Sequence, residues 1–340
     1  MDSLTQIVLG AACGELILGK KIGNKALLFG AIGGTIPDLD VFIGKIFYAN
    51  EIQAMAFHRG FMHSIFFAIL GTFLFGWLAF KLYNTGKRTH TSSLKDWRLL
   101  FFWSIFTHPL LDCFTPYGTQ LFAPISDYRV AFNNISVVDP LYTVPFLICL
   151  MVVLFFKRTN SKRSKWTKAG IYISSFYMLF TIGNKLYVDA IFRKSYEKAG
   201  LKIDRFSAQP TILNNILWYA VAETKDRYHI TFYSLFDTSK TANTIISIDK
   251  NHGLIDMTDK NLQTLAWFSN NYYNISKSEK EDTYKYVDLR YPILNPEDLN
   301  TALFKFTVIN KNNEWDMLPF QGNPPNKKDF TKFTERFWGI

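Results

Sequence analysis

Cysteine is scarce in this sequence, and the patterns in which cysteines usually act are missing. Three cysteines occur among 340 residues, Cys13, Cys113 and Cys149, each in or beside a hydrophobic stretch. They have neither the close spacing of a zinc motif nor the paired framework of a small secreted domain. We therefore expect three free structural thiols, so that any chemistry must come from other residues.

The N-terminus lacks the basic region that precedes a cleavable signal peptide. Asp2 follows Met1 directly, and an apolar run begins at Leu4. The first hydrophobic stretch is therefore expected to stay in the mature protein. No internal repeat or low-complexity tract stands out in the remainder.

Hydrophobic residues are abundant but unevenly distributed. They make up 48% of the chain, with 17% aromatic residues, which is more than soluble domains usually have. Nearly all long apolar runs fall in residues 1–190, so we predict a membrane-embedded domain there and a small extracytoplasmic α+β domain of unknown role in residues 191–340. Six apolar stretches approach the length of a membrane crossing: 4–19, 26–46, 61–82, 99–117, 140–156 and 169–189.

The charges between these stretches alternate in sign along the chain. The first, third and fifth loops are rich in Lys and Arg, whereas the other two contain mainly Asp and Glu. Basic loops usually stay in the cytoplasm, so about six crossings would put both termini outside. The bias also accounts for the net charge of +10 without a nucleic-acid partner. A soluble protein with buried helices would leave the bias unexplained.

Beyond residue 200 the pattern changes to that of strands. The clearest pair, 216–224 and 227–235, predicts a β-hairpin, and further strands are expected at 283–291 and 303–309. His229 and His252 occur in this region, the first in a strand pattern and the second in a turn. We expect structural or surface roles for both.

Ionisable and polar residues gather at the predicted outer ends of the apolar stretches. Counting about 1.5 Å per residue from each basic rim places them at roughly 20 to 27 Å in a hydrocarbon core of about 30 Å. Such groups are costly at that depth and usually functional. The set comprises Asp2, Gln6, Asp38, Asp40, His58, Arg59, His63, His108, Asp112, Arg129 and Asp139.

Their spacing suits a metal. His108 and Asp112 lie four residues apart, so a helix would project both from one face. Asp38 and Asp40 follow Pro37, and an extended dipeptide there would aim both carboxylates the same way. We predict metal ligands among six residues: His58, His63, His108, Asp112, Asp38 and Asp40. The last two are also candidates for the general base.

Four short motifs in order resemble the YdjM-type family of inner-membrane, metal-dependent hydrolases over residues 1–190. They are Met1-Asp2-Ser3-Leu4-Thr5-Gln6, Pro37-Asp38-Leu39-Asp40, His58-Arg59-Gly60-Phe61-Met62-His63-Ser64 and Thr107-His108-Pro109-Leu110-Leu111-Asp112, and Asp139-Pro140 also matches. The resemblance implies a helical hydrolase in the bacterial cytoplasmic membrane with His and Asp ligands. The His-x-x-x-Asp element is also similar to that of zinc-dependent phospholipase C, which implies zinc as the divalent metal, with one to three ions.

One position departs from the family pattern. Many members carry His where this chain has Gln6, and an amide is a much poorer zinc ligand than imidazole. Glu15 would lie on the opposite helix face, so Asp2, one turn before Gln6, is the better substitute.

Together these features predict a membrane-bound, metal-dependent hydrolase that favours lipid or lipid-linked phosphoesters at the outer leaflet. Arg59 and Arg129 would hold an anionic group, with Arg59 counted among the catalytic residues, and Asp139 would orient a ligating His. The alternative is a non-enzyme: a metal or proton transporter, or a scaffold that binds a partner. The gathering of polar residues at one depth leaves no path across the membrane, and no oligomeric state is predicted.

Overall fold

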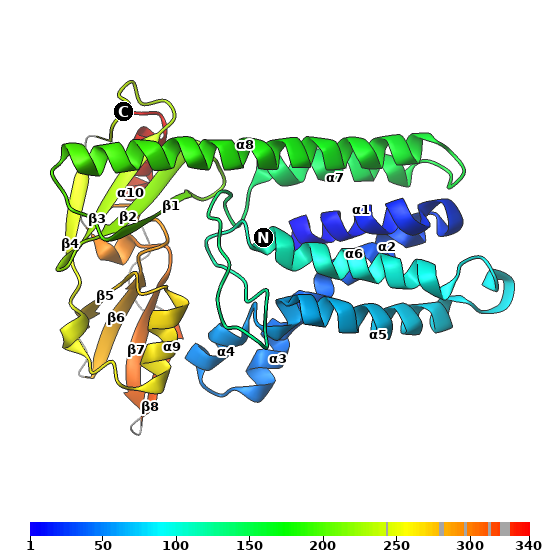
Figure 1. The fold of residues 1–340 in the computed structure, drawn as a ribbon, viewed down its shortest axis with the longest axis horizontal. Coiled ribbons are helices and arrows are strands. Elements are labelled where there is room, and N and C mark those ends of the chain that lie inside the picture. The colour runs from blue at the N-terminus through cyan, green and yellow to red at the C-terminus, as the bar shows by residue number, and fades with distance from the viewer. Residues whose placement is uncertain (243, 279–281, 296–297, 312–313, 320–326) are drawn as a thin grey trace. The chain divides into compact units, whose positions relative to one another are not determined.

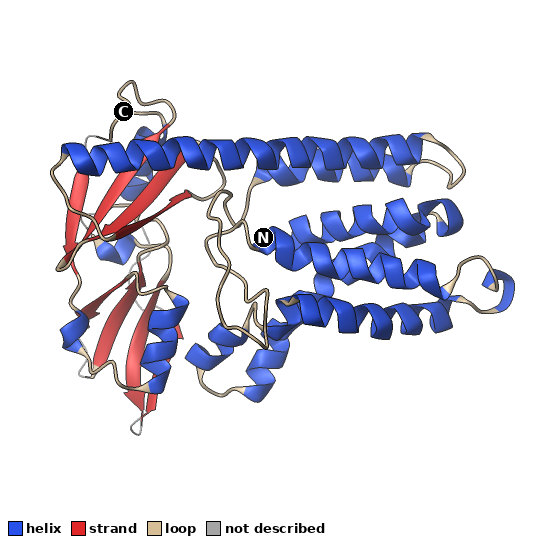
Figure 2. Cartoon of the chain, viewed as in Figure 1, coloured by secondary structure: helices blue, strands red, loops and turns tan. Residues whose placement is uncertain are grey.

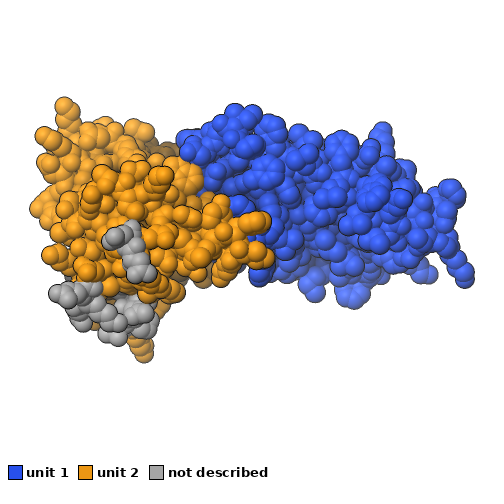
Figure 3. Space-filling model, turned by 90° about the horizontal axis from the view of Figure 1, so that it is seen from below, with its two compact units in different colours: residues 1–43, 57–181 blue, residues 44–56, 182–340 orange. Residues whose placement is uncertain are grey.

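The structure is a computed structural model that describes residues 1–340 except 243, 279–281, 296–297, 312–313 and 320–326 (Figure 1). It divides into two compact units (Figure 3). The first comprises residues 1–43 and 57–181, and the second comprises residues 44–56 and 182–340. Helices make up the regular structure of the first unit, whereas the strands belong to the second (Figure 2). The domain boundary predicted at residue 190 lies inside a helix, α8 (Lys162–Lys198).

The first unit is a bundle of helices. Its complete α-helices are α1 (Ser3–Ile22), α2 (Asn24–Thr35), α5 (Ile65–Tyr83), α6 (Leu94–Asp112) and α7 (Pro140–Leu154). The beginnings of α3 (Asp40–Phe47) and α8 also belong to it. Its 3-10 helices are η1 (Ile36–Leu39), η2 (Phe61–His63) and η3 (Gly86–Arg88). The short α4 (Glu51–Phe57) falls mainly in the second unit.

Two helical segments of the described chain are long and apolar enough to cross a membrane, Asn24–Phe47 and Ile65–Tyr83. Pro140–Leu154 is apolar but shorter. The prediction of about six spans is therefore not supported by length and hydropathy. The physical reason is that the remaining helices are either short or carry polar and charged residues within their apolar stretches, as α6 does with His108 and Asp112.

The close contact of α1 with α2 depends on glycine. A Cβ on Gly14 would lie 2.1 Å from the carbonyl oxygen of Ala26, and one on Gly30 would lie 2.2 Å from the carbonyl oxygen of Gly10. Likewise, a Cβ on Gly34 would lie 2.5 Å from the carbonyl oxygen of Gln6. Because no side chain separates the backbones, the beginning of α1 lies directly against the end of α2.

The described residues of the second unit form two antiparallel sheets of four strands each. The first has the order β1 (Arg205–Pro210), β2 (Leu217–Glu223), β3 (Arg227–Ser234), β4 (Ile245–Asp249). The second has the order β5 (Tyr273–Lys277), β6 (Thr283–Asp288), β7 (Lys305–Lys311), β8 (Glu314–Pro319). The predicted hairpin is confirmed as β2 and β3, paired with Glu223 opposite Tyr228. The other two predicted strands correspond to β6 and β7.

Each sheet is preceded by a helix that packs on one of its faces. The end of α8 places Phe192 and Tyr196 against Trp218 and Ala220 of β2. Before the second sheet, α9 (Lys260–Phe268) places Leu262 and Leu265 in a shared core. A helix followed by four antiparallel strands therefore occurs twice, and α10 (Lys327–Phe337) comes after the second sheet.

Candidate metal centre

Polar residues from α1, η1, α3, η2 and α6 meet at one end of the first unit's bundle. Asp38 lies in η1, Asp40 begins α3, His63 ends η2, and His108 and Asp112 occupy the last turns of α6. His63, His108 and Asp112 are buried, with side chains at most 1% exposed. The structure therefore brings together residues that are far apart in the sequence.

The two buried histidines face each other through their Nε2 atoms, 3.1 Å apart. His108 uses its other ring nitrogen, Nδ1, on the carbonyl oxygen of Gly34 at 2.6 Å, so Nδ1 carries a proton. Nδ1 of His63 lies 3.0 Å from Asp40 Oδ2, although off the direction of a regular hydrogen bond. Both rings, when neutral, thus direct an unprotonated Nε2 toward the same point.

Two carboxylates complete this group of donor atoms. Asp38 Oδ1 lies 3.4 Å from His63 Nε2 and 3.3 Å from His108 Nε2. Asp112 Oδ2 lies 3.5 Å from each of the same nitrogens, and no described group forms a hydrogen bond with it. Four ligands at zinc distances in a tetrahedron would be about 3.3 Å apart. The spacing and donor types therefore fit a divalent metal, and Asp38, His63 and His108 could hold one.

Asp40 contacts two histidines with its two carboxylate oxygens. Oδ1 lies 2.7 Å from His58 Nδ1, and Oδ2 accepts a hydrogen bond from the backbone N–H of Arg59 at 3.0 Å in addition to facing His63. Asp40, His58 and His63 also form a group that could hold a metal. The 2.7 Å distance is that of a hydrogen bond, which favours Asp40 as the residue that orients both rings.

Access to the centre is from the side of Asp38 and His58. Each of these side chains is 22% exposed, whereas the other members of the group are almost fully buried. Burial lowers the pKa of His58 below its ordinary value of 6.5, although the hydrogen bond with Asp40 acts in the opposite direction. His58 is therefore neutral at neutral pH, with Nε2 available as a proton acceptor.

Gln6 lies inside the centre and contacts Asp112. Its amide nitrogen donates to Asp112 Oδ1 at 3.0 Å and to the carbonyl oxygen of His108 at 3.2 Å. The N-terminal amine of Met1 also contacts Asp112 Oδ1. Gln6 thus supports a carboxylate that belongs to the donor group, and the amine of Met1 is a neighbour that reasoning from side-chain types does not find.

An arginine cluster lies beside the donor atoms. Arg59, which is buried, has its Nε 3.3 Å from Asp112 Oδ2 and donates from a terminal nitrogen to the hydroxyl of Thr115 at 2.9 Å. Its guanidinium carbon lies 4.6 Å from the ring centre of Tyr117, and that of Arg129 lies 5.0 Å from the same centre. Thr115 and Tyr117 were not predicted, yet they follow Asp112 closely in the sequence.

Two predicted candidates act as helix caps. Asp2 accepts from the backbone N–H of Thr5 at 3.1 Å and begins α1. Asp139 accepts from the backbone N–H of Leu141 at 3.0 Å and from the hydroxyl of Tyr177 at 2.9 Å. A carboxylate that precedes a proline at the first helical position is suited to capping, and these contacts give Asp139 that role. That Asp139 also orients a ligating histidine stays a prediction.

The remaining notable ionisable groups have structural partners. Glu15 forms a buried ion pair with Arg163 at 2.5 Å. In the second unit, His229 Nδ1 lies 2.9 Å from the Ser247 hydroxyl, and the His252 ring stacks on that of Tyr273 with 4.0 Å between centres.

Comparison with known proteins agrees with the resemblance of the motifs. The family model described as YdjM inner membrane protein matches residues 1–188. The protein named "Uncharacterized protein YfhP" from Bacillus subtilis (strain 168) is 28% identical over 159 residues, or 45% of this chain and 46% of that protein. The chain thus spans about half the length of this curated relative. No solved structure matches the chain. Because the family model covers more than half of its residues, the chain belongs to the family of YdjM inner membrane proteins.

Proposed function

We propose that the first unit is a membrane-bound, metal-dependent hydrolase that acts on lipid or lipid-linked phosphoesters. The observation that carries the proposal is the convergence of His63 Nε2 and His108 Nε2 at 3.1 Å, with the other nitrogen of each ring within 3.0 Å of an oxygen atom. Two neutral imidazoles in this arrangement would bring two lone pairs together. A shared cation removes this repulsion, as would a proton.

The donor set is compatible with zinc, the divalent metal that the resemblance of the His-x-x-x-Asp element implies. Its four members are two imidazole nitrogens and two carboxylate oxygens, from His63, His108, Asp38 and Asp112, and both ligand types suit zinc or manganese. A metal held there would supply Lewis acidity, polarising the scissile bond and lowering the pKa of a water.

The neighbouring side chains have distinct tasks in this proposal. Asp40 fixes the orientation of His63 and His58 by contacting Nδ1 of each. His58 lies where the centre opens, so its Nε2 accepts a proton from the attacking water or delivers one to the leaving group. Asp38, also partly exposed, serves as a ligand and as a second candidate base.

The charges around the centre favour an anionic substrate. Asp38, Asp40 and Asp112 contribute three negative charges, and Arg59 and Arg129 contribute two positive charges. With neutral histidines, a divalent cation would change this side-chain sum from −1 to +1, and the N-terminal amine of Met1 beside Asp112 adds to the positive charge when it is protonated. Because Arg59 and Arg129 both lie over the ring of Tyr117, a phosphate next to this ring would meet two guanidinium groups.

Membrane embedding of the bundle is supported by its surface. Large apolar side chains are exposed on each of its longer helices, including Leu16, Leu28, Leu74, Trp103, Leu141 and Phe176. A water-soluble bundle would normally bury such residues. We therefore propose that the helices that are shorter or more polar than Asn24–Phe47 and Ile65–Tyr83 also lie in the bilayer.

The position of the centre supports a substrate at the membrane surface. Asp112 is the last residue of α6, and His63 precedes the first residue of α5 by two positions, so the centre lies at one end of these helices. The alternation of loop charge supports a position for that end outside the cytoplasm. A lipid head group would therefore be closer than a cytoplasmic metabolite.

A transporter is the competing function. The inner half of the bundle contains Glu15, but its carboxylate is paired with Arg163 through two hydrogen bonds at 2.8 and 2.5 Å. This closed pair does not continue the polar centre, which favours hydrolysis over transport.

The deciding experiment combines metal analysis with an activity screen on protein in lipid nanodiscs. Wild-type protein should contain a divalent metal and release phosphate or a phosphorylated head group from a lipid panel in a chelator-sensitive manner. Arg59→Ala should retain metal while losing cleavage of phosphate-containing lipids. Metal-loaded wild-type protein that cleaves only soluble substrates would overturn the lipid assignment, and metal-dependent ion flux without cleavage would favour the transporter.

A further inference from the structure

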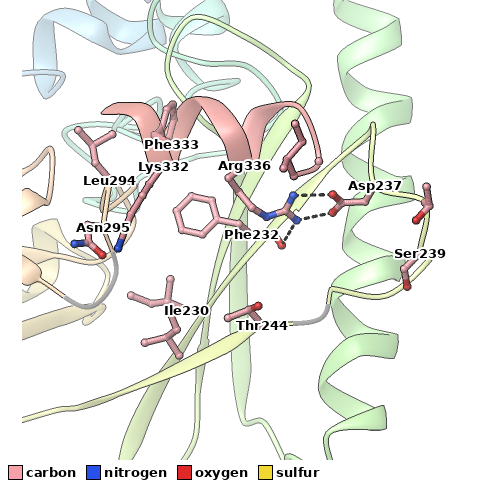
Figure 4. A pocket seen from close by; sticks show the side chains of 14 residues that line it. Ile230, Phe232, Asp237, Ser239, Thr244, Leu294, Asn295, Lys332, Phe333 and Arg336 are labelled. Carbon is pink, nitrogen blue, oxygen red and sulfur yellow. Dashed lines mark hydrogen bonds and ion pairs between the residues drawn. The ribbon is translucent and has the colours of Figure 1, made fainter. Parts of the chain in front are cut away.

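Several basic residues of this protein are held in close ion pairs. In the second unit, Arg336 donates to both carboxylate oxygens of Asp237 at 2.6 and 2.5 Å (Figure 4). In the first unit, Lys21 Nζ lies 2.6 Å from a carboxylate oxygen of Asp96. A base in such a pair has its charge largely balanced, which leaves little attraction for a further anion.

Lys25 and Arg88 are arranged differently, because both lie against the ring of Tyr83. Lys25 Nζ is 5.5 Å from the ring centre, and the guanidinium carbon of Arg88 is 4.9 Å from it. Arg88 also donates to the hydroxyl of Thr85 in a long hydrogen bond of 3.4 Å. Within the part of the chain that the structure describes, neither base forms an ion pair with a carboxylate. Two positive charges therefore gather around one ring, which favours an anion beside them.

The ring of Tyr83 is held by two further aromatic side chains. Its centre lies 6.2 Å from that of Phe29 in α2 and 5.2 Å from that of Trp97 in α6, and the last two are 4.7 Å apart. Tyr83 and Trp97 are buried, and Trp97 Nε1 donates to the hydroxyl of Ser92 at 3.0 Å. The support on which the two bases meet is thus fixed before any ligand binds, which reduces the entropic cost of binding.

This aromatic and basic site lies where two membrane-crossing segments end. Tyr83 is the last residue of Ile65–Tyr83 and Lys25 is the second residue of Asn24–Phe47, the two segments long and apolar enough to cross a membrane. Because α5 begins beside the metal centre and ends at Tyr83, the site belongs to the opposite end of the helix. Basic residues at such ends meet the head groups of lipids.

An apolar surface continues from Lys25 along α2. Leu28 and Ile32 are exposed, and they follow Lys25 by three and seven positions, which places all three on one face of the helix. A molecule with a phosphate at Lys25 and an acyl chain along Leu28 and Ile32 would therefore match both the charge and the apolar surface.

We propose that Lys25, Arg88 and the ring of Tyr83 bind the phosphate of an anionic phospholipid, such as phosphatidylglycerol. The acyl chains lie along Leu28 and Ile32, in the leaflet opposite the metal centre. This binding site is separate from the metal centre and does not depend on hydrolysis.

Native mass spectrometry tests the proposal. The full chain in detergent is titrated with phosphatidylglycerol or with phosphatidylcholine of the same acyl chains, and the affinity for the first bound lipid is measured. Wild type should prefer phosphatidylglycerol. The double variant Lys25→Gln with Arg88→Gln should bind phosphatidylglycerol about tenfold or more weakly and bind phosphatidylcholine as before.

A matched control separates the site from general charge. Lys20 and Lys165 are exposed residues at the same end of the bundle, so Lys20→Gln with Lys165→Gln removes two charges and should leave the affinity within about twofold of wild type. Lys25→Arg with Arg88→Lys keeps both charges and should also retain binding. The same loss in the control as in Lys25→Gln with Arg88→Gln, or no preference of wild type for phosphatidylglycerol, would overturn the proposal.

A competition arm distinguishes a lipid from a soluble phosphate. Inorganic phosphate and glycerol 3-phosphate, added at the concentration of the lipid, should not displace phosphatidylglycerol, because they lack the acyl chains. Displacement by either would assign the site to a soluble anion and overturn the lipid. Loss of phosphoester cleavage with normal lipid binding here would affect only the function proposed for the metal centre.

Discussion

His63 and His108 present their Nε2 atoms to each other at 3.1 Å, although 45 positions separate them in the sequence. The contact is set from outside the pair, by the carbonyl oxygen of Gly34 on His108 and by Asp40 on His63. Each acceptor favours a proton on Nδ1 and leaves Nε2 unprotonated. The surroundings of the two rings, rather than the rings alone, therefore prepare the site for a cation.

The first prediction concerns metal content. His108→Ala removes a donor atom and the bond to Gly34, so purified protein should lose most of its bound divalent metal, as measured by inductively coupled plasma mass spectrometry. His252→Ala, which removes an imidazole from the second unit, should leave the content unchanged. Equal metal in wild type and His108→Ala would exclude His108 from the site.

The second prediction separates orientation from ligation. Asp40→Asn keeps the size of the side chain but removes the charge that orients His58 and His63, so metal affinity should fall by about 10- to 100-fold, as is typical for groups that orient ligands. Competition with a chromophoric chelator measures this change. Glu51→Gln, at an exposed position in α4, is the control. An unchanged affinity in Asp40→Asn would show that His63 needs no carboxylate partner.

Much of the donor group could be predicted from spacing. His108 and Asp112 share a helix face, as their spacing predicts. The extended dipeptide expected at Asp38 and Asp40 is wrong, because Asp38 lies in the 3-10 helix η1 and Asp40 begins α3. The separate roles of Asp38 and Asp40 could not be predicted, because they depend on which atoms the distant His58, His63 and His108 present. Asp139 is a different case. Its predicted depth in the membrane is the same as that of the cluster, but it directly precedes Pro140 at the start of α7 and caps this helix.

The fold was predictable to a similar extent. Alternating patterns identified the hairpin of β2 and β3, because both strands are short, regular and joined by a tight turn. The repeated arrangement of a helix and four strands was not visible, since the sequence shows no internal repeat. The assignment of residues 44–56 to the second unit also depends on long-range contacts, such as the burial of Ile52 with Leu262 and Leu265.

The third prediction concerns the glycine contact of α1 and α2. Gly14→Ala would place a methyl group 2.1 Å from the carbonyl oxygen of Ala26, so the helices must separate, at a cost of about 1–3 kcal/mol. Gly183→Ala in α8 meets nothing within 4 Å and should be neutral or stabilising by about 0.5–1 kcal/mol. Thermal unfolding in detergent compares the two. A Gly14→Ala protein as stable as wild type would contradict the close packing.

The fourth prediction is a pH dependence in the second unit. Burial raises the pKa of Glu223, but hydrogen bonds and charge from Lys250 and Arg205 outweigh it and hold the pKa below the ordinary value of 4.5. A depressed carboxyl pKa stabilises the fold above the unfolded-state value, and this contribution is lost as the pH falls through the folded-state value.

Glu223→Gln should therefore increase amide hydrogen exchange in β2 and β3 relative to wild type near neutral pH. The difference should shrink as the pH falls below the ordinary carboxyl value of 4.5 and through the lower folded-state pKa of Glu223, where the carboxylate of the wild type becomes protonated. Asp226→Asn, in the exposed turn between the same strands, controls for the loss of one negative charge. A difference that stays constant across this pH range would show that Glu223 acts through packing rather than charge.

The fifth prediction tests the topology that follows from loop charge. Residues 84–97 and 157–168 carry an excess of Lys and Arg and should face the cytoplasm, whereas residue 340 should lie outside. Single cysteines can be placed at Thr89, Asn160 and Ile340 in a chain whose Cys13, Cys113 and Cys149 are replaced by Ala or Ser. A membrane-impermeant maleimide should label position 340 in intact cells and label the other two only after the membrane is permeabilised. Because two helical segments of the described residues are long and apolar enough to cross a membrane, the experiment also tests whether the other helices cross. The predicted topology has an odd number of crossings between positions 89 and 340. Labelling of both positions from the same side would contradict this number and, with it, the prediction that the metal centre faces outward.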